Sequence, residues 1–209
     1  MIDHSIVTEQ DKRASEESRH RRTHSSHHAS RKEQHMEFPP FQSRQEVVIH
    51  APLQAVWDFN QDLTNIAVYH PRVERVDLIS GKRQRGKGVA YRCHLTDGKH
   101  TCVEKDLEVV PMERIVMALP EDTMGIAKML PDYVVESRLT PVASHETKVE
   151  FSHYYSTKSL KAKFFNVIAK RKIARDAQNT FEAMKRTIEQ HASSSFEGLK
   201  EHAAYDQDA

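Results

Sequence analysis

The stretch Val47–Leu78, VVIHAPLQAVWDFNQDLTNIAVYHPRVERVDL, decides how this chain folds. The β-branched run in Glu46–His50 predicts a short strand. Pro52 then suits the first turn of a helix, because its missing N–H would have no partner there. The apolar residues that follow at spacings of three and four, on one helical face, are Leu53, Val56 and Trp57.

A second short helix is expected over Leu63–Tyr69, ending before His70-Pro71, since the residue before a proline disfavours helical geometry. Six more strands follow from alternation and turn signals: Val73–Ile79, Gly88–Leu95, Thr101–Val110, Arg114–Leu119, Tyr133–Leu139 and Thr147–Tyr155. A long helix is predicted over Ser159–His191, with one apolar face. The order β-α-α-β6-α predicts an α+β fold, in which a curved antiparallel sheet of seven strands packs against the long C-terminal helix.

Composition divides the chain into three parts. Residues 1–45 are rich in His, Arg and Ser and predict a disordered N-terminal extension, residues 46–191 predict one folded domain, and residues 192–209 predict a flexible acidic tail. With 38% hydrophobic residues overall, the apolar content is concentrated in the middle part. That part is long enough to bury a core.

The charge and the cysteine count exclude several classes of protein. The formal net charge is +1, so the chain lacks the strong positive field that a dedicated nucleic-acid-binding protein would have. The sequence has no apolar run of membrane-spanning length and no signal-peptide core near Met1, so a cytoplasmic location is expected. Two cysteines without a CxxC motif do not predict a disulfide scaffold or a zinc module, and we expect no cofactor.

The order of several short motifs resembles the START-like, or SRPBCC, superfamily, which includes polyketide cyclase/dehydrase-like and pollen-allergen-type proteins. The resemblance covers about residues 46–191. The motifs that carry it are Ala51-Pro52, Val56-Trp57, Asp62, Tyr69-His70-Pro71, Gly86–Gly88, Asp97-Gly98 and the bend Glu108–Arg114.

This resemblance implies a helix-grip fold, in which the sheet wraps around the C-terminal helix and leaves a tunnel for an apolar ligand. Members bind lipids, sterols, polyketides or quinones, and only some are enzymes, so the fold does not settle the function. The expected function is binding of a hydrophobic small molecule by a non-catalytic carrier or sensor. The alternatives are a polyketide cyclase/dehydratase-type enzyme and an interaction module, such as a quinone-handling or chaperone-assisting protein.

Asp97-Gly98 predicts a two-residue hairpin turn, which makes Cys93 face Cys102 and Tyr91 face Glu104. Two reduced thiols or a cross-strand disulfide are both compatible with that pairing. Which face of these strands lines the tunnel is left open. If Tyr91 and Glu104 point inward, a desolvated Glu104 could act as a general acid or base; otherwise it is a surface carboxylate.

The candidates for catalysis are Tyr91, Glu104 and His153, the last on a strand whose alternate residues face one side. Met124, Ile126, Met129 and Leu130 in the long segment Pro120–Asp132 predict either an apolar lid or ordinary core. The full set of ligand-binding candidates is Trp57, Tyr69, His70, Tyr91, Met117, Met124, Met129, Phe151, His153, Tyr155, Phe164 and Ile168.

Three further patterns carry weaker predictions. The segment Gly81–Gly88 nearly matches a phosphate-binding loop, but it lacks the hydroxyl residue and the following helix, so a solvated basic turn is expected. His20, His24 and His28 do not predict a metal site, because nothing favours a stable helix there. The basic residues that begin the last helix are either a solvated face or a weak contact for anionic lipid: Lys158, Lys161, Lys163, Lys170, Arg171, Lys172 and Arg175.

Overall fold

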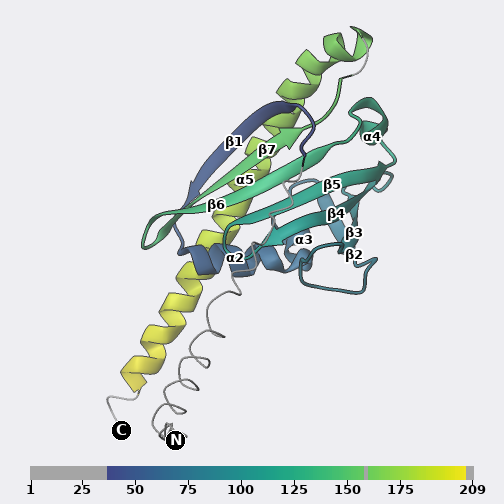
Figure 1. The fold of residues 1–209 in the computed structure, drawn as a ribbon. Helices are drawn as coiled ribbons and strands as arrows, with labels where there is room; N and C mark the ends of the chain where they lie inside the picture. The colour runs from purple at the N-terminus through teal and green to yellow at the C-terminus, as the bar shows by residue number, and fades with distance from the viewer. Residues whose placement is uncertain (1–36, 158–159, 206–209) are drawn as a thin grey trace, which may run out of the picture. The chain divides into compact units, whose positions relative to one another are not determined.

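The structure is a computed structural model that describes residues 37–157 and 160–205, with side chains described as far as Thr157 and over 166–193. Seven antiparallel strands form one sheet in the order β1-β7-β6-β5-β4-β3-β2 (Figure 1). The strands are β1 (Phe41–Ile49), β2 (Val73–Asp77), β3 (Ala90–Leu95), β4 (Thr101–Val110), β5 (Arg114–Asp122), β6 (Val134–Ala143) and β7 (Glu146–Tyr154). The predicted α+β architecture and helix-grip arrangement are confirmed.

In the described part of the chain, three helical segments follow β1, one short helix lies between β5 and β6, and the long helix follows β7. They are α2 (Leu53–Gln61), the 3-10 turn η1 (Leu63–Asn65), α3 (Ile66–Tyr69), the short α4 (Ile126–Met129) and α5 (Leu160–Tyr205). Pro52 occupies the N-cap of α2, with φ −59°. Asp62 caps η1 by accepting from the Thr64 amide at 3.0 Å, so the predicted second helix is split into a 3-10 turn and α3.

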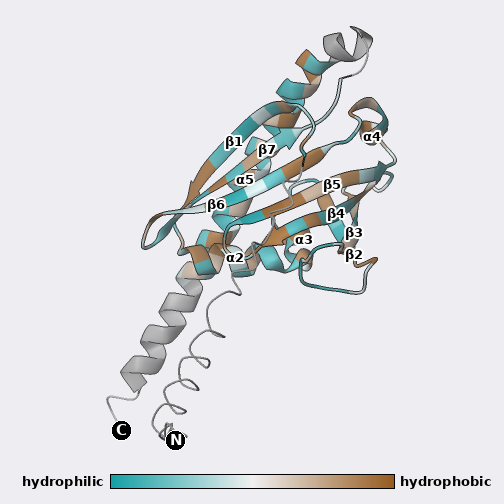
Figure 2. Ribbon diagram, viewed as in Figure 1, coloured by the Kyte–Doolittle hydropathy of each residue, from teal (hydrophilic) through white to brown (hydrophobic). Residues whose placement is uncertain are grey.

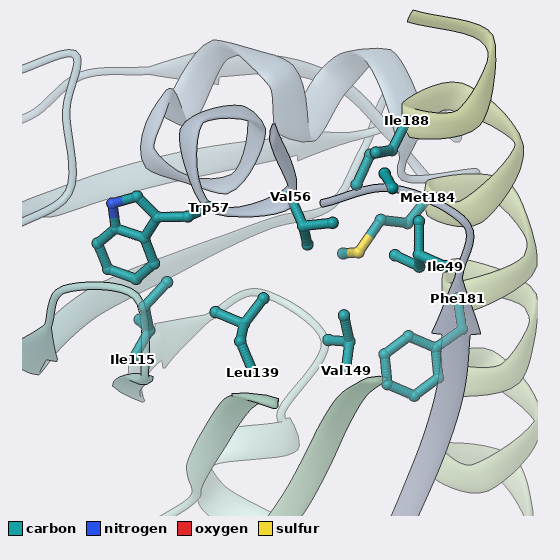
Figure 3. Packing of buried hydrophobic residues seen from close by; sticks show 10 residues of the cluster. Ile49, Val56, Trp57, Ile115, Leu139, Val149, Phe181, Met184 and Ile188 are labelled. Atoms are coloured by element: carbon teal, nitrogen blue, oxygen red, sulfur yellow. The ribbon is translucent and has the colours of Figure 1, made fainter. Parts of the chain in front are cut away.

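The main core is formed where α5 crosses the sheet. Phe181 stacks on Phe151 of β7 with ring centroids 4.4 Å apart, and it is fully buried. The other members come from α2, α5 and four strands (Figure 3): Ile49, Ala51, Val56, Trp57, Ile115, Leu139, Val149, Met184 and Ile188. Burying a phenylalanine or leucine side chain contributes about 1.5–3 kcal/mol, so this crossing fixes the middle of α5 against the sheet.

Hydrophobic and hydrophilic residues alternate along much of the sheet (Figure 2). Ion pairs across neighbouring strands occupy its polar positions: Arg44 of β1 pairs with Glu150 of β7 at 3.6 Å, and Arg114 of β5 with Glu136 of β6 at 3.8 Å. The alternation leaves the other face apolar and directs it toward α5. Within the described ranges, no helix is long and apolar enough to cross a membrane.

Several predicted boundaries are wrong. β1 begins at Phe41, so residues 41–45 belong to the sheet and not to a disordered extension. Helix α5 continues to Tyr205 instead of ending at His191, so the first part of the predicted flexible tail is helical. A short helix, α4, forms inside the long segment 120–132, because the Asp122 carboxylate accepts hydrogen bonds from the amides of Ile126 and Ala127.

The β3–β4 hairpin keeps the predicted partners but not the predicted turn. Cys93 faces Cys102, and Tyr91 faces Glu104. The Leu95 amide donates to the His100 carbonyl at 2.9 Å, which makes the loop four residues long. The carboxylate of Asp97 accepts from the amide of His100, which holds this longer loop closed.

Candidate functional site

A cavity of about 920 Å³ lies between the concave face of the sheet and the N-terminal half of α5. Its walls come from α3, β2 to β7, α4 and α5. The apolar lining residues are Ile66, Val73, Leu95, Ile115, Met117, Leu119, Met124, Ile126, Met129, Leu130, Val135, Phe151, Ile168, Ile173 and Ala177. A mostly apolar concave space with a few polar groups is the usual form of a small-molecule site.

Glu104 places a carboxyl group on the cavity wall. The Tyr91 hydroxyl donates to Oε2 of Glu104 at 2.7 Å, and Nη1 of Arg85 donates to the same hydroxyl at 2.8 Å. Burial raises the pKa of Glu104, although the Tyr91 hydrogen bond and the Arg85 charge act against that rise. This answers the question left open by the sequence, because Tyr91 and Glu104 both lie on the inward face.

Arg85 connects this group to a buried ion pair. Its Nη1 lies 2.9 Å from Oδ1 of Asp106, and the two side chains are 5% and 0% exposed. The Gly86 amide donates to the other Asp106 oxygen at 3.2 Å. Although burial acts to lower it, the contacts with Tyr91 and Asp106 raise the pKa of Arg85 above its ordinary value, so the guanidinium stays charged.

The sequence predicted that Gly81–Gly88 is a solvated basic turn. This prediction is wrong in part, because the segment also carries the buried Arg85. Its backbone is tied to the α2–η1 junction, since Leu63 N–H donates to the Arg83 carbonyl at 2.9 Å and Arg85 N–H to the Gln61 carbonyl at 3.0 Å. The Arg83 guanidinium pairs with Asp62 at 2.6 Å. These contacts hold the loop so that Arg85 points into the protein.

Cys93 and Cys102 lie side by side beneath Glu104. Both are buried free thiols, and Cys102 lines the cavity. A hydrogen bond with Cys102, together with burial, raises the pKa of the Cys93 thiol. The Cys93 thiol is therefore protonated at neutral pH in the absence of another ligand.

His153 lines the cavity from β7. Its Nδ1 lies 2.8 Å from the Tyr133 hydroxyl, and the two rings are nearly parallel, at 10°. Burial lowers the pKa of His153 to about 4, so the imidazole is neutral at pH 7. Its Nε2 is buried and has no hydrogen-bond partner among the described residues.

Charged and exposed residues mark the opening of the cavity. Asp176 of α5 accepts from Arg72 and from Lys172, each at 2.9 Å. Met129 and Ile168 line the same space and are 60% and 58% exposed. The opening therefore combines apolar side chains with cationic ones.

The structure brings most of the predicted ligand-binding residues to this cavity. Those that line it are Tyr69, His70, Met117, Met124, Met129, Phe151, His153 and Ile168, and the catalytic candidate Glu104 lines it too. Burial raises the pKa of Tyr69 to about 12 and lowers that of His70 to about 4, so both are neutral at pH 7. Their roles in binding remain predictions.

Three of the other candidates are buried and do not line the cavity. Trp57 packs in the main core, Tyr91 reaches the cavity only through Glu104, and the Tyr155 hydroxyl donates to Asn166 Oδ1 at 2.7 Å. The Phe164 side chain is outside the described part of the chain. The histidines at 20, 24 and 28 and the lysines at 158, 161 and 163 are outside it too.

Sequence analysis missed Arg85 and Tyr133. An arginine in a Gly/Lys-rich loop has the pattern of a solvated residue, and Tyr133 stands at the edge of a predicted strand. One signal for Arg85 was available. The hairpin pairing places Asp106 on the same face as Glu104, and a buried carboxylate requires a cationic or hydrogen-bonding partner.

The comparison with family models gives one match, over residues 40–189, to the family described as polyketide cyclase / dehydrase and lipid transport. No curated protein sequence matches the chain. The similarity to solved structures extends over most of each relative, at low sequence identity.

An aromatase/cyclase, Zhui, from Streptomyces sp. R1128 is 17% identical with a TM-score of 0.55, covering 71% of this chain and 93% of its own. A norcoclaurine synthase point mutant from Thalictrum flavum is 16% identical with a TM-score of 0.56, covering 71% and 94%. A START superfamily protein from Mycobacterium smegmatis is 10% identical with a TM-score of 0.52, covering 74% and 99%. At these identities the three structures show a shared fold. On the family match, the chain belongs to the polyketide cyclase / dehydrase and lipid transport family.

Proposed function

We propose that this domain binds a hydrophobic small molecule, such as a lipid or a polyketide, in the cavity between the sheet and α5, and that it acts as a non-catalytic carrier or sensor. The observation that carries the proposal is the apolar lining of a space of about 920 Å³. Each 100 Å² of apolar ligand surface removed from water would contribute about 2.5 kcal/mol to binding.

The hydrogen bonds of the polar wall groups favour a carrier. Glu104 is held by Tyr91, His153 by Tyr133, and Asp176 by Arg72. Within the described chain, Glu104 and His153 do not belong to one hydrogen-bonded network. A catalytic site for acyl or aldol chemistry would instead place its acid and its base around one reacting atom.

Native mass spectrometry of the purified full chain tests the proposal directly. We expect a bound species that extracts into organic solvent and rebinds at one molecule per chain. Ala169→Trp would fill the cavity from α5, because Ala169 lines it, and should abolish rebinding. Val167→Trp is the matched control, since Val167 is 57% exposed on the same helix. Equal rebinding by both variants would refute the proposal.

A second candidate is a cyclase/dehydratase-type enzyme, and the Arg85–Tyr91–Glu104 chain of hydrogen bonds favours it. Because burial raises the pKa of Glu104, its carboxyl group keeps a proton to a higher pH than an exposed glutamate does and would donate it to a ligand oxygen. Tyr91 would stabilise the carboxylate that remains, by the 2.7 Å hydrogen bond.

Incubation with a synthetic linear poly-β-ketone separates the two candidates. An enzyme would convert it to an aromatic product with a new near-ultraviolet band, and Glu104→Gln would lower kcat by about 100-fold or more. Glu74→Gln, at an exposed position on β2, serves as the control. Binding of the poly-β-ketone without turnover by the wild-type protein would support the carrier.

A further inference from the structure

Two thiols and a carboxylate meet on the cavity wall. One ligand atom each from Cys93, Cys102 and Glu104 lies within 4.8 Å of the other two. The β3–β4 register produces this cluster, because Cys93 faces Cys102 and the next inward residue along β4 is Glu104. Cys102 and Glu104 both line the cavity, so the cluster borders an open space.

We propose that Cys93, Cys102 and Glu104 bind one zinc ion, with a fourth coordination position open toward the cavity. Zinc binds thiolate at about 2.3 Å and carboxylate oxygen at about 2.0–2.2 Å in a tetrahedron, which sets its ligand atoms about 3.5–3.8 Å apart. The three ligand atoms lie within 4.8 Å of one another, so a contraction of about 1 Å gives that spacing. This inference goes beyond ligand binding and does not depend on it.

The surrounding residues already orient the carboxylate. The Tyr91 hydroxyl donates to Oε2 of Glu104, which leaves Oε1 for the metal. Arg85 donates to Tyr91 and is itself fixed by Asp106. Partners of this kind, one step removed from the metal, hold ligands in place and typically account for a 10–100-fold difference in affinity.

Metal binding changes the charge of the site. Zinc binding converts the two thiols to thiolates and releases two protons to solvent, with a third where Glu104 is protonated. Three anionic ligands around a dication leave one negative charge. The guanidinium of Arg85, which also pairs with Asp106, lies two hydrogen bonds from Glu104 through Tyr91 and reduces the cost of that charge.

The spacing of the two cysteines along the sequence gives no sign of a metal site. The two cysteines are nine positions apart and form no CxxC motif, which is why the sequence predicted no metal. The hairpin makes them neighbours.

Cobalt titration of the reduced full chain tests the proposal. Cobalt replaces zinc in tetrahedral sites and gives near-ultraviolet charge-transfer bands only when thiolate is bound. We expect these bands to saturate at one cobalt per chain and to disappear when zinc is added. Histidines give no such band, so metal held by the N-terminal histidines does not interfere.

Variants then assign the ligands. Cys93→Ser and Cys102→Ser should each abolish the bands, Glu104→Gln should weaken cobalt binding at least 10-fold, and Tyr91→Phe should weaken it 10–100-fold. A variant with His20, His24 and His28 changed to Ala should keep the bands.

A measurement on the wild-type chain covers the case in which a cysteine variant does not fold. One equivalent of zinc should protect both thiols from alkylation. Absence of charge-transfer bands in the reduced protein, unchanged affinity in Glu104→Gln, or thiols that zinc leaves unprotected would each overturn the site.

Discussion

Tyr91 and Glu104 occupy facing positions on β3 and β4, and the Tyr91 hydroxyl lies 2.7 Å from Oε2 of Glu104 on the wall of an apolar cavity. The pair is held from behind by Arg85 and Asp106, which are both closed off from solvent. Ionisable groups in such surroundings affect stability as well as chemistry, and this makes the site testable without a known ligand.

Glu104→Gln should stabilise the protein at neutral pH. Burial raises the pKa of Glu104 in the folded state above the ordinary value of 4.5, so the folded protein holds this proton more tightly than the unfolded chain. Between 4.5 and the folded pKa, the free energy of unfolding therefore falls as pH rises. Glutamine removes this loss.

Urea unfolding from pH 4 to pH 8 measures the effect. The variant and the wild type should converge at the acidic end and separate toward pH 8, with the variant more stable. Glu74→Gln, on the exposed side of β2, should follow the wild-type curve. A Glu104→Gln protein that is less stable at pH 8 would contradict the assignment.

Arg85→Met should destabilise the protein by about 3–5 kcal/mol, because it leaves the Asp106 carboxylate buried without its cation. The double variant Arg85→Met/Asp106→Leu should be less destabilised than Arg85→Met alone, since it removes the unpaired charge. Chemical denaturation of the two single variants and the double variant gives the coupling.

Arg75→Met is the control for this cycle. Arg75 pairs with Asp77 at 2.6 Å, but its side chain is 60% exposed, so its loss should change the free energy of unfolding by less than about 1 kcal/mol. Equal effects of Arg75→Met and Arg85→Met would show that burial does not control the strength of these pairs.

His153→Gln should reduce the acid sensitivity of the fold. The pKa of His153 is lowered to about 4 by burial, whereas an unfolded histidine titrates near 6.5. From pH 6.5 down to pH 4 the unfolded chain binds more protons, so stability falls as pH falls. The loss from this residue reaches about 3 kcal/mol at pH 4.

Thermal unfolding at pH 4, 5.5 and 7 tests this point. Removing His153 should flatten the curve, and His145→Gln, at an exposed position in the β6–β7 turn, should not. If the dependence of stability on pH is the same in His153→Gln as in the wild type, the pKa of His153 is not lowered by folding.

The exposed positions between 167 and 175 of α5 should contact anionic lipid weakly. Val167 and Ile168 are more than half exposed, and Arg171 and Arg175 lie exposed on the same part of the helix. Each basic residue near an anionic surface contributes about 1 kcal/mol. Arg171→Glu/Arg175→Glu should therefore lower binding to anionic vesicles by at least 10-fold.

Co-sedimentation at increasing salt gives the second readout. Binding should weaken as salt screens the charges, and neutral vesicles should bind little. Lys82→Glu, in the loop beside β3, should behave as the wild type. Vesicle binding that persists at high salt would contradict an electrostatic contact.

The sequence was sufficient for the fold because local signals agreed with one another. Pro52 marked the start of α2, and the Asp97-Gly98 turn placed Cys93 opposite Cys102 even though the loop is longer than predicted. The two register shifts between β4 and β5 were not predictable. They follow Val103 and Asp106, so a strict alternation from the turn does not assign the rest of the strand.

The site was predictable only in part, for a physical reason. Trp57 was assigned to the ligand, but the same helical periodicity turns it into the main core, where it is 6% exposed. Arg85 was assigned to solvent because nothing in its neighbours along the chain indicates Asp106, which is 21 positions later. Long-range pairing of buried charges depends on packing, which local patterns do not report.

Helix α5 has two roles along its length. Residues between 166 and 180 line the cavity, whereas Phe181, Met184 and Ile188 pack in the main core. The two sets of residues do not overlap, so substitutions within 166–180 can change the shape of the cavity without removing the core contacts of Phe181, Met184 and Ile188. The shape of the cavity and the stability of the core thus depend on different stretches of the same helix.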